Sequence, residues 1–241
     1  MFRHRGKTRT LSHNLRIASL LSFVAGIVNV TGFLAVQRLT TNVTGHFAFF
    51  VDEVFKLNFW GGFVYFLYIF SFFLGSFVSS LLIEIISRKN DHSIYVVPAS
   101  IECLILFVIG FWGEGLIIKS PNTITFSLLF AMGLQNSLVT TISSASVRTT
   151  HLTGLFTDLG IELSQLFFYK ANEQKHKLMS SIKLRLTIIS FFFIGGIVGG
   201  VLYSKVGIHT LIFAATTLVV GLIYDNIKFR LILLRRKLKS G

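Results

Sequence analysis

Six apolar segments, each about as long as a bilayer is thick, restrict the fold of this chain more than any other feature. They lie at residues 17–36, 60–86, 95–118, 123–143, 185–204 and 207–226. Because about 20 helical residues cross a hydrocarbon core of about 30 Å, each segment is long enough for one span. With 52% hydrophobic residues, 14% charged residues and two prolines, the chain is too apolar for an ordinary soluble domain and is free to form long helices. The sequence therefore predicts an all-α polytopic transmembrane helix bundle with six full spans.

Two further helical stretches are shorter and carry carboxylates. Residues 43–57 include Glu53, and residues 152–169 include Asp158 and Glu162. At the α-helical rise these stretches reach about 22 to 27 Å, less than a full crossing needs. A span that faces lipid avoids carboxylates because their burial in hydrocarbon is costly. We therefore expect two short or re-entrant helices that protein surrounds on most sides.

An internal repeat divides the chain into two halves. Three colinear pairs of blocks have similar sequences: 25–26 with 132–133, 40–45 with 149–154, and 72–80 with 192–200. Glu53 and Glu162 then occupy equivalent positions without a gap. Repeats of this kind are the sequence signature of a duplicated architecture. We therefore expect a first repeat at 17–120 and a second at 121–226, between a basic segment at 1–16 and a basic tail at 227–241.

The number of spans in each half determines how the halves are related. Three spans in a half is an odd number, so the second half begins on the opposite side of the membrane and the repeat is inverted. Residues 37–58 hold two Lys or Arg, whereas the corresponding residues 144–185 hold six, as expected for loops on opposite sides. If the short helices crossed fully, the chain would have eight spans in a parallel duplication. We expect the inverted arrangement.

The formal charge of +13 comes from basic residues that gather in blocks beside the apolar segments. These blocks lie near the N-terminus, around residues 170–185, and in the tail at 228–239. Such a distribution is typical of cytoplasmic loops that face an anionic lipid leaflet. It places both termini in the cytoplasm. It gives no support to nucleic-acid binding, because aromatic residues do not alternate with the basic ones.

The repeated motif also carries a resemblance to a known family. The segment Asn42-Val43-Thr44-Gly45-His46, ahead of a short helix, resembles the Asn-x-Thr-Gly signature of the YoaK-like bacterial membrane proteins. The segment 149–154, with Asp158 after it, is similar to the motif in the second half of that family. The resemblance covers about residues 17 to 224. It implies a multi-pass protein of the bacterial cytoplasmic membrane, and it supplies neither an activity nor site residues.

The two Thr-Thr-x-x-Thr-Gly segments are the candidate binding site for a solute. Each offers hydroxyls, a flexible glycine and the free N–H groups at a helix start, which together can bind a polar or anionic group. Two such segments that face each other across a repeat interface would form a midplane site of the kind that secondary transporters use. Alternatively, the threonines at 40, 44, 149 and 153 cap helices and bond to backbone. The candidate substrate-binding residues are Asn29, Thr41, Asn42, Thr44, Gly45, Asn136, Thr150, His151, Thr153 and Gly154.

The carboxylates of the short helices are candidates for proton coupling. Glu53, Asp158 and Glu162 would exchange protons near neutral pH if the membrane desolvated them. Alternatively, they lie at headgroup level beside Lys56 and Lys170. The sequence does not decide between these positions.

Signals of enzymatic chemistry are missing from the sequence. It contains no HExxH, P-loop, GxSxG or CxxC motif, and the single Cys103 cannot form a disulfide within the chain. We expect no catalytic residues, metal or cofactor, and we expect Glu102 to be an interfacial or hydrogen-bonded residue. The functional hypothesis is secondary transport of a small polar or anionic solute with proton coupling. The alternative is a non-transporting membrane sensor, scaffold or assembly partner, and a homo-oligomer is compatible with either.

Overall fold

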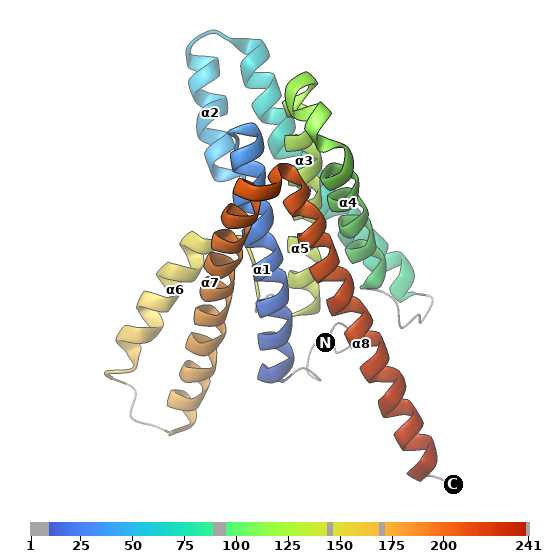
Figure 1. Ribbon diagram of the computed structural model, residues 1–241. Coiled ribbons are helices and arrows are strands. Elements are labelled where there is room, and N and C mark those ends of the chain that lie inside the picture. The colour runs from blue at the N-terminus through green and yellow to red at the C-terminus, as the bar shows by residue number, and fades with distance from the viewer. Residues whose placement is uncertain (1–9, 89–94, 144–146, 169–171, 240–241) are drawn as a thin grey trace.

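The computed structural model describes residues 10–88, 95–143, 147–168 and 172–239 (Figure 1). All regular structure within these ranges is helical, as the apolar segments predicted. In chain order the elements are α1 (Leu11–Val36), α2 (Thr44–Phe55), α3 (Phe59–Ser87), α4 (Val96–Lys119), α5 (Pro121–Ile142), α6 (Leu152–Gln165), α7 (Asn172–Val206), the 3₁₀ turn η2 (Gly207–His209) and α8 (Thr210–Lys239).

Each apolar segment expected to span the membrane lies in a helix of its own, and the two short stretches form α2 and α6. The helix ends differ from those expected. Helix α7 begins at Asn172 rather than near 185, and α8 continues to Lys239 rather than ending near 226. Polar residues alone do not end a helix; a helix-breaking residue such as proline does. No proline lies within 172–185 or 226–239. The basic residues of segment 1–9, and Lys170, lie outside the described residues.

Five stretches in the described ranges are long and apolar enough to cross a membrane. Four are α1, α3, α4 and α5, and the fifth runs from Glu173 to Tyr224. This fifth stretch contains nearly all of α7, η2 and the first half of α8, and the chain reverses direction at η2 (Figure 1). The reversal uses Gly207, whose φ of 57° lies in the left-handed region that glycine adopts without steric cost.

Helices α1 and α5 form the centre of the bundle. In each of them 61% of the most apolar window is buried, against 17% for α3 and 33% for α4. The main packing partner of α1 is α7, and that of α5 is α3. Helices α4 and α8 pack against each other and against the central pair, α4 on α5 and α8 on α1. The outer helices thus shield the two central ones.

The surface of the bundle is strongly apolar. A row of phenylalanines on α3 is between 44% and 58% exposed: Phe63, Phe66, Phe70, Phe73 and Phe77. A soluble protein would bury such a row, whereas lipid accepts it. The exposed face of α3 therefore fits a helix that contacts acyl chains.

Four glycines lie where the central helices cross their partners. Gly26 and Gly195 occupy the α1–α7 crossing, and Gly75 and Gly133 occupy the α3–α5 crossing. A Cβ atom at any of the four would lie 2.1 or 2.2 Å from a carbonyl oxygen of the facing helix. Because lipid supplies little hydrophobic force between helices, such close backbone packing is a main source of their association. These contacts hold α1 against α7 and α5 against α3.

Candidate functional site

The connections that follow α1 and α5 fold back onto the helices they leave. In the first connection, the buried Thr40 hydroxyl donates a hydrogen bond to the Val28 carbonyl at 3.4 Å. In the second, the buried Thr149 hydroxyl donates to Oε1 of Gln135 at 3.1 Å. A buried hydroxyl without a partner would be costly, so these bonds hold each connection against its central helix.

A second hydrogen bond in each connection joins an asparagine to a threonine. Thr41 Oγ1 donates to Asn29 Oδ1 at 2.6 Å, and Asn136 Nδ2 donates to Thr150 Oγ1 at 2.9 Å. Both asparagines lie on the central helices, and both threonines lie just before a short helix. The two bonds thus join residues that the repeat alignment treats as equivalent.

A cavity of about 950 Å³ lies between the two connections. It is large enough for a small metabolite together with water. Of the ten residues predicted to bind substrate, Gly154 is outside the lining. The other nine line the cavity: Asn29, Thr41, Asn42, Thr44, Gly45, Asn136, Thr150, His151 and Thr153.

Sequence reasoning missed ten other residues of the described lining, and four of them add distinct chemistry. Phe72 of α3 and Phe192 of α7 supply aromatic surface, and Ser76 lies one turn beyond Phe72. Arg148 is the only arginine or lysine in the described lining, where the other group that can carry a positive charge is His151. The block alignment contained a signal for the two phenylalanines, because they begin its third pair of blocks. It contained none for Arg148, whose equivalent is Leu39.

The alternative reading, in which the motif threonines cap helices and bond to backbone, fits Thr40, whose hydroxyl donates to the Val28 carbonyl. The hydroxyls of Thr44 and Thr153 cap neither short helix. At the start of α2 it is Asn42, the residue before the N-cap Val43, whose Oδ1 accepts a hydrogen bond from the Gly45 amide at 3.2 Å. The hydroxyls of Thr44 and Thr153 line the cavity and have no hydrogen-bond partner among the described residues. They are therefore available to a solute or to water.

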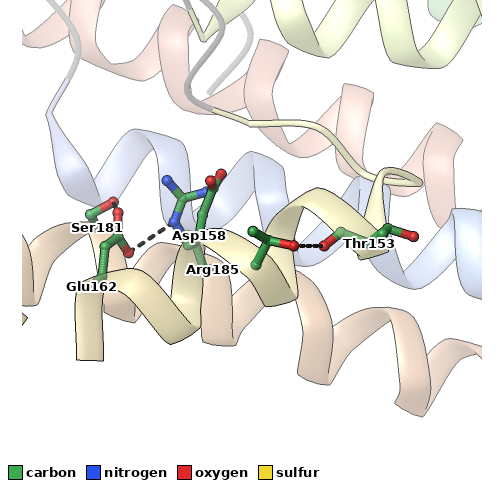
Figure 2. A network of polar contacts seen from close by, with 6 residues as sticks. Thr153, Asp158, Glu162, Ser181 and Arg185 are labelled. Atoms are coloured by element: carbon green, nitrogen blue, oxygen red, sulfur yellow. Dashed lines mark hydrogen bonds and ion pairs between the residues drawn. The ribbon is translucent and has the colours of Figure 1, made fainter. Parts of the chain in front are cut away.

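The carboxylates of α6 form an ion-pair network with α7 (Figure 2). Arg185 contacts Asp158 through Nη1 at 2.8 Å and Glu162 through Nε at 2.8 Å. Ser181 donates a further hydrogen bond to Glu162 at 2.6 Å. The side chain of Glu162 is 13% exposed and that of Arg185 is 23% exposed, so the pair is largely shielded. Sequence reasoning placed Arg185 in a basic loop and therefore missed this contact.

The third predicted carboxylate, Glu53, lies near the end of α2 and accepts a hydrogen bond from Asn58. It therefore does not pair with Lys56, which instead contacts Asp52 at 2.6 Å. None of Glu53, Asp158 and Glu162 belongs to the described cavity lining.

The two histidines of the motifs have different surroundings. His46 is buried, its Nε2 lies 2.6 Å from the Leu39 carbonyl, and its ring packs against Tyr65 and Tyr68. His151 is exposed and lines the cavity. Within the described part of the chain, His, Cys, Asp and Glu side chains form no group of three that could hold a metal ion.

Comparison with known proteins gives a family but no activity. The family described as "Protein of unknown function (DUF1275)" matches residues 17–224. The UPF0700 transmembrane protein YoaK of Bacillus subtilis (strain 168) is 24% identical over 183 residues, which cover 76% of this chain and 80% of the relative. No solved structure matches the chain. The apolar helices and the transmembrane relative make this a multi-pass membrane protein, and the chain belongs to the DUF1275 family, as its resemblance to YoaK-like proteins predicted.

Proposed function

We propose that this protein is a secondary transporter, rather than an enzyme, for a small polar or anionic solute. The observation that carries the proposal is the cavity, which both halves line with equivalent groups. Asn29 and Thr41 come from one half, and Asn136 and Thr150 from the other. Secondary transporters commonly bind substrate at such a repeat interface, between short or broken helices. Here α2 and α6 are the short helices that begin at the cavity.

We further infer that the two halves form an inverted repeat of six full spans and two short helices. Helix packing supports this relation. Gly26 packs against the Phe192 carbonyl, and its equivalent Gly133 packs against the Phe72 carbonyl. At the same two crossings Gly195 faces the Phe23 carbonyl, and its equivalent Gly75 faces the Phe130 carbonyl. A twofold relation between the halves accounts for both pairs of equivalent contacts.

The helix directions support the inversion. In Figure 1 helices α1, α4 and α7 rise, whereas α3, α5 and α8 descend. Each helix therefore runs opposite to its equivalent in the other half. The short helices follow the same rule, because α2 rises and α6 descends. In the proposed topology the start of α1 and the end of α8 face the cytoplasm of a bacterial inner membrane, where basic residues meet anionic lipid.

Thiol labelling tests the topology. Lys56, beyond α2, and Lys175, in the first turn of α7, are exposed residues at opposite ends of the molecule (Figure 1). We expect a membrane-impermeant maleimide to label Lys56→Cys in intact cells and Lys175→Cys only after permeabilisation. The native Cys103 is buried and supplies the unlabelled background. Labelling of both cysteines from the same side would contradict the inverted repeat.

The chemistry of the cavity favours an anion. Arg148 is exposed to it and forms no ion pair among the described residues. The hydroxyls of Thr44 and Thr153 add hydrogen-bond donors. Each lies in the first turn of a helix, where free N–H groups and the helix dipole also favour negative charge. The proposed role of Arg148 is to bind the negative group of the solute.

Uptake into proteoliposomes tests the function. The probe is a mixture of radiolabelled small carboxylates, amino acids and inorganic phosphate, supplied with and without an inward proton gradient. We expect the wild type to accumulate at least one anion and Arg148→Gln to lower that uptake about 10- to 150-fold, since a charged hydrogen bond contributes about 1.5 to 3 kcal/mol. Lys175→Gln removes an exposed charge far from the cavity and should leave uptake unchanged. No accumulation by correctly inserted wild-type protein would favour the sensor, scaffold or assembly role instead.

A further inference from the structure

A carboxyl group lies completely buried in the middle of the bundle, away from the carboxylates of the short helices. Glu102 of α4 is 0% exposed, and its Oε1 accepts a hydrogen bond from Nε2 of Gln135 on α5 at 2.9 Å. Its Oε2 is buried and has no hydrogen-bond partner among the described residues. A buried polar atom without a partner is rare in folded proteins and often marks a functional group.

Hydrogen bonds connect this carboxyl to the proposed binding cavity. Gln135 donates to Glu102 and accepts from the buried Thr149 hydroxyl at 3.1 Å. Thr149 immediately precedes Thr150, which lines the cavity and accepts a hydrogen bond from Asn136, another lining residue. The same Thr149 hydroxyl lies 3.4 Å from Asn136 Oδ1, so it can donate to either amide oxygen. We call Glu102, Gln135, Thr149 and Asn136 the polar chain.

No charged group compensates a negative charge on Glu102. In the described part of the chain it has no ion pair, and its one hydrogen-bond partner is an amide. Glu114 and His209 contact each other at 3.3 Å, and Cys103 lies nearest the Ala215 carbonyl, at 3.9 Å. Helix α5 carries no titratable residue. On α4 itself the other titratable groups are Cys103, Glu114 and Lys119. On the elements packed around α4, the described titratable groups are His209 of η2, Tyr224 of α8, and Tyr65, Tyr68 and Glu84 of α3.

We propose that Glu102 is the proton-carrying residue of this protein and that the polar chain couples its protonation to occupancy of the cavity. Glu102 is sealed from solvent in this conformation, so its proton leaves to water only in a conformation in which water reaches the carboxyl. There the O–H bond breaks, its electron pair stays on the oxygen, and both carboxylate oxygens become acceptors. The orientation of the Gln135 amide, with Nε2 toward Glu102 and Oε1 toward Thr149, serves a carboxylate. A protonated Glu102 that donates its O–H to the Gln135 oxygen requires the amide to turn over, and Thr149 then loses that acceptor beside the cavity. This inference rests on the proposed transport function and replaces Glu53, Asp158 and Glu162 as the coupling groups.

Infrared difference spectroscopy of the protein in liposomes tests Glu102 without a known substrate. We expect a pH step to change a carboxylic-acid C=O band that is absent from Glu102→Gln. The control Glu114→Gln removes a largely exposed carboxylate of the same helix and should keep the band. A band that persists in folded Glu102→Gln would overturn the proposal.

Chemical modification inside the cavity tests the coupling. Ser137 lines the cavity and is outside the polar chain, so Ser137→Cys can carry a cationic or a neutral methanethiosulfonate group there. We expect the cationic group to lower the intensity of the Glu102 band by more than half and the neutral group to leave it unchanged. When Gln135→Met is added to Ser137→Cys, the Glu102 band should remain, but the cationic group should no longer change its intensity. This variant tests the polar chain even if Glu102→Gln does not fold. An unchanged response in Gln135→Met, or no response in the parent, would overturn the coupling.

The uptake assay separates this inference from the proposed function. With the radiolabelled mixture as the probe, Glu102→Gln should lose stimulation by the proton gradient and retain exchange without a gradient. Wild-type stimulation that survives in Glu102→Gln would remove Glu102 and leave transport intact. Absence of any wild-type uptake, with the infrared response present, would remove transport and leave a protonation-coupled cavity.

Discussion

Replacement of Gly26, Gly75, Gly133 or Gly195 by alanine is expected to lower the yield of folded protein severely. The added Cβ would lie 2.1 or 2.2 Å from a backbone carbonyl oxygen of the facing helix. A flexible side chain could move aside, but here a whole helix must shift, and α1 and α5 are the most buried helices of the bundle. Overpacking in a well-packed core costs about 1 to 3 kcal/mol and more where backbone is involved. Yield of monodisperse protein in detergent, together with its thermal midpoint, measures the effect.

A matched control is available for this prediction. No atom lies within 4 Å of a Cβ added at Gly115 of α4 or Gly160 of α6. Alanine at either position should be neutral or slightly stabilising, because alanine favours a helix by about 1 kcal/mol relative to glycine. If a crossing glycine and Gly115 tolerate alanine equally, the close packing described above is wrong.

Replacement of Arg185 by methionine is expected to destabilise the contact between α6 and α7 by about 2 to 3 kcal/mol. The substitution leaves Asp158 and Glu162 without their shared cation. Removal of one partner of a buried ion pair costs about 3 to 5 kcal/mol, and partial exposure of this network lowers that figure. The loss should appear as a lower unfolding midpoint in detergent and as earlier proteolysis within α6.

Two further variants separate this effect from a general loss of charge. Lys177→Met breaks an exposed pair with Glu173 and should cost no more than about 1 kcal/mol. The positions equivalent to Asp158 and Arg185 in the first half are Phe49 and Tyr65, whose rings stack at 5.3 Å. The double variant Asp158→Phe, Arg185→Tyr copies that contact and should recover part of the stability. Equal stability of Arg185→Met and Lys177→Met would contradict a structural role for the network.

The asparagine–threonine bonds show what a repeat in the sequence can predict. The alignment of the two halves selected Asn29, Thr41, Asn136 and Thr150 as one set, and all four line the same cavity. The alignment did not show that each threonine returns to the helix that precedes it. That contact depends on how the chain turns between two helices, and no regular period encodes it. The nine lining residues were therefore found by equivalence, and their bonding was not predicted.

The roles of the acidic residues depended on contacts across the fold. Asp158 and Glu162 were predicted to carry protons because carboxylates within a membrane are costly. The cation that compensates them, Arg185, lies on the next helix, in a segment where the charge pattern indicated a loop. Glu102 was expected to be merely interfacial or hydrogen-bonded, and its bond to Gln135 joins residues of two different helices. Sequence spacing gives no information on such pairs.

The sequence by itself determined that this chain is a helical membrane protein, and its block alignment selected most of the residues that line the cavity. Both follow from local properties, because the length and polarity of a segment set its free energy of transfer into lipid. Only the tertiary structure decided which polar groups meet in the cavity, which carboxylates are paired with a cation, and that Glu102 has neither a cation nor access to solvent. These features depend on where helices cross, and the crossings are set by backbone contacts such as the one between Gly26 and Phe192.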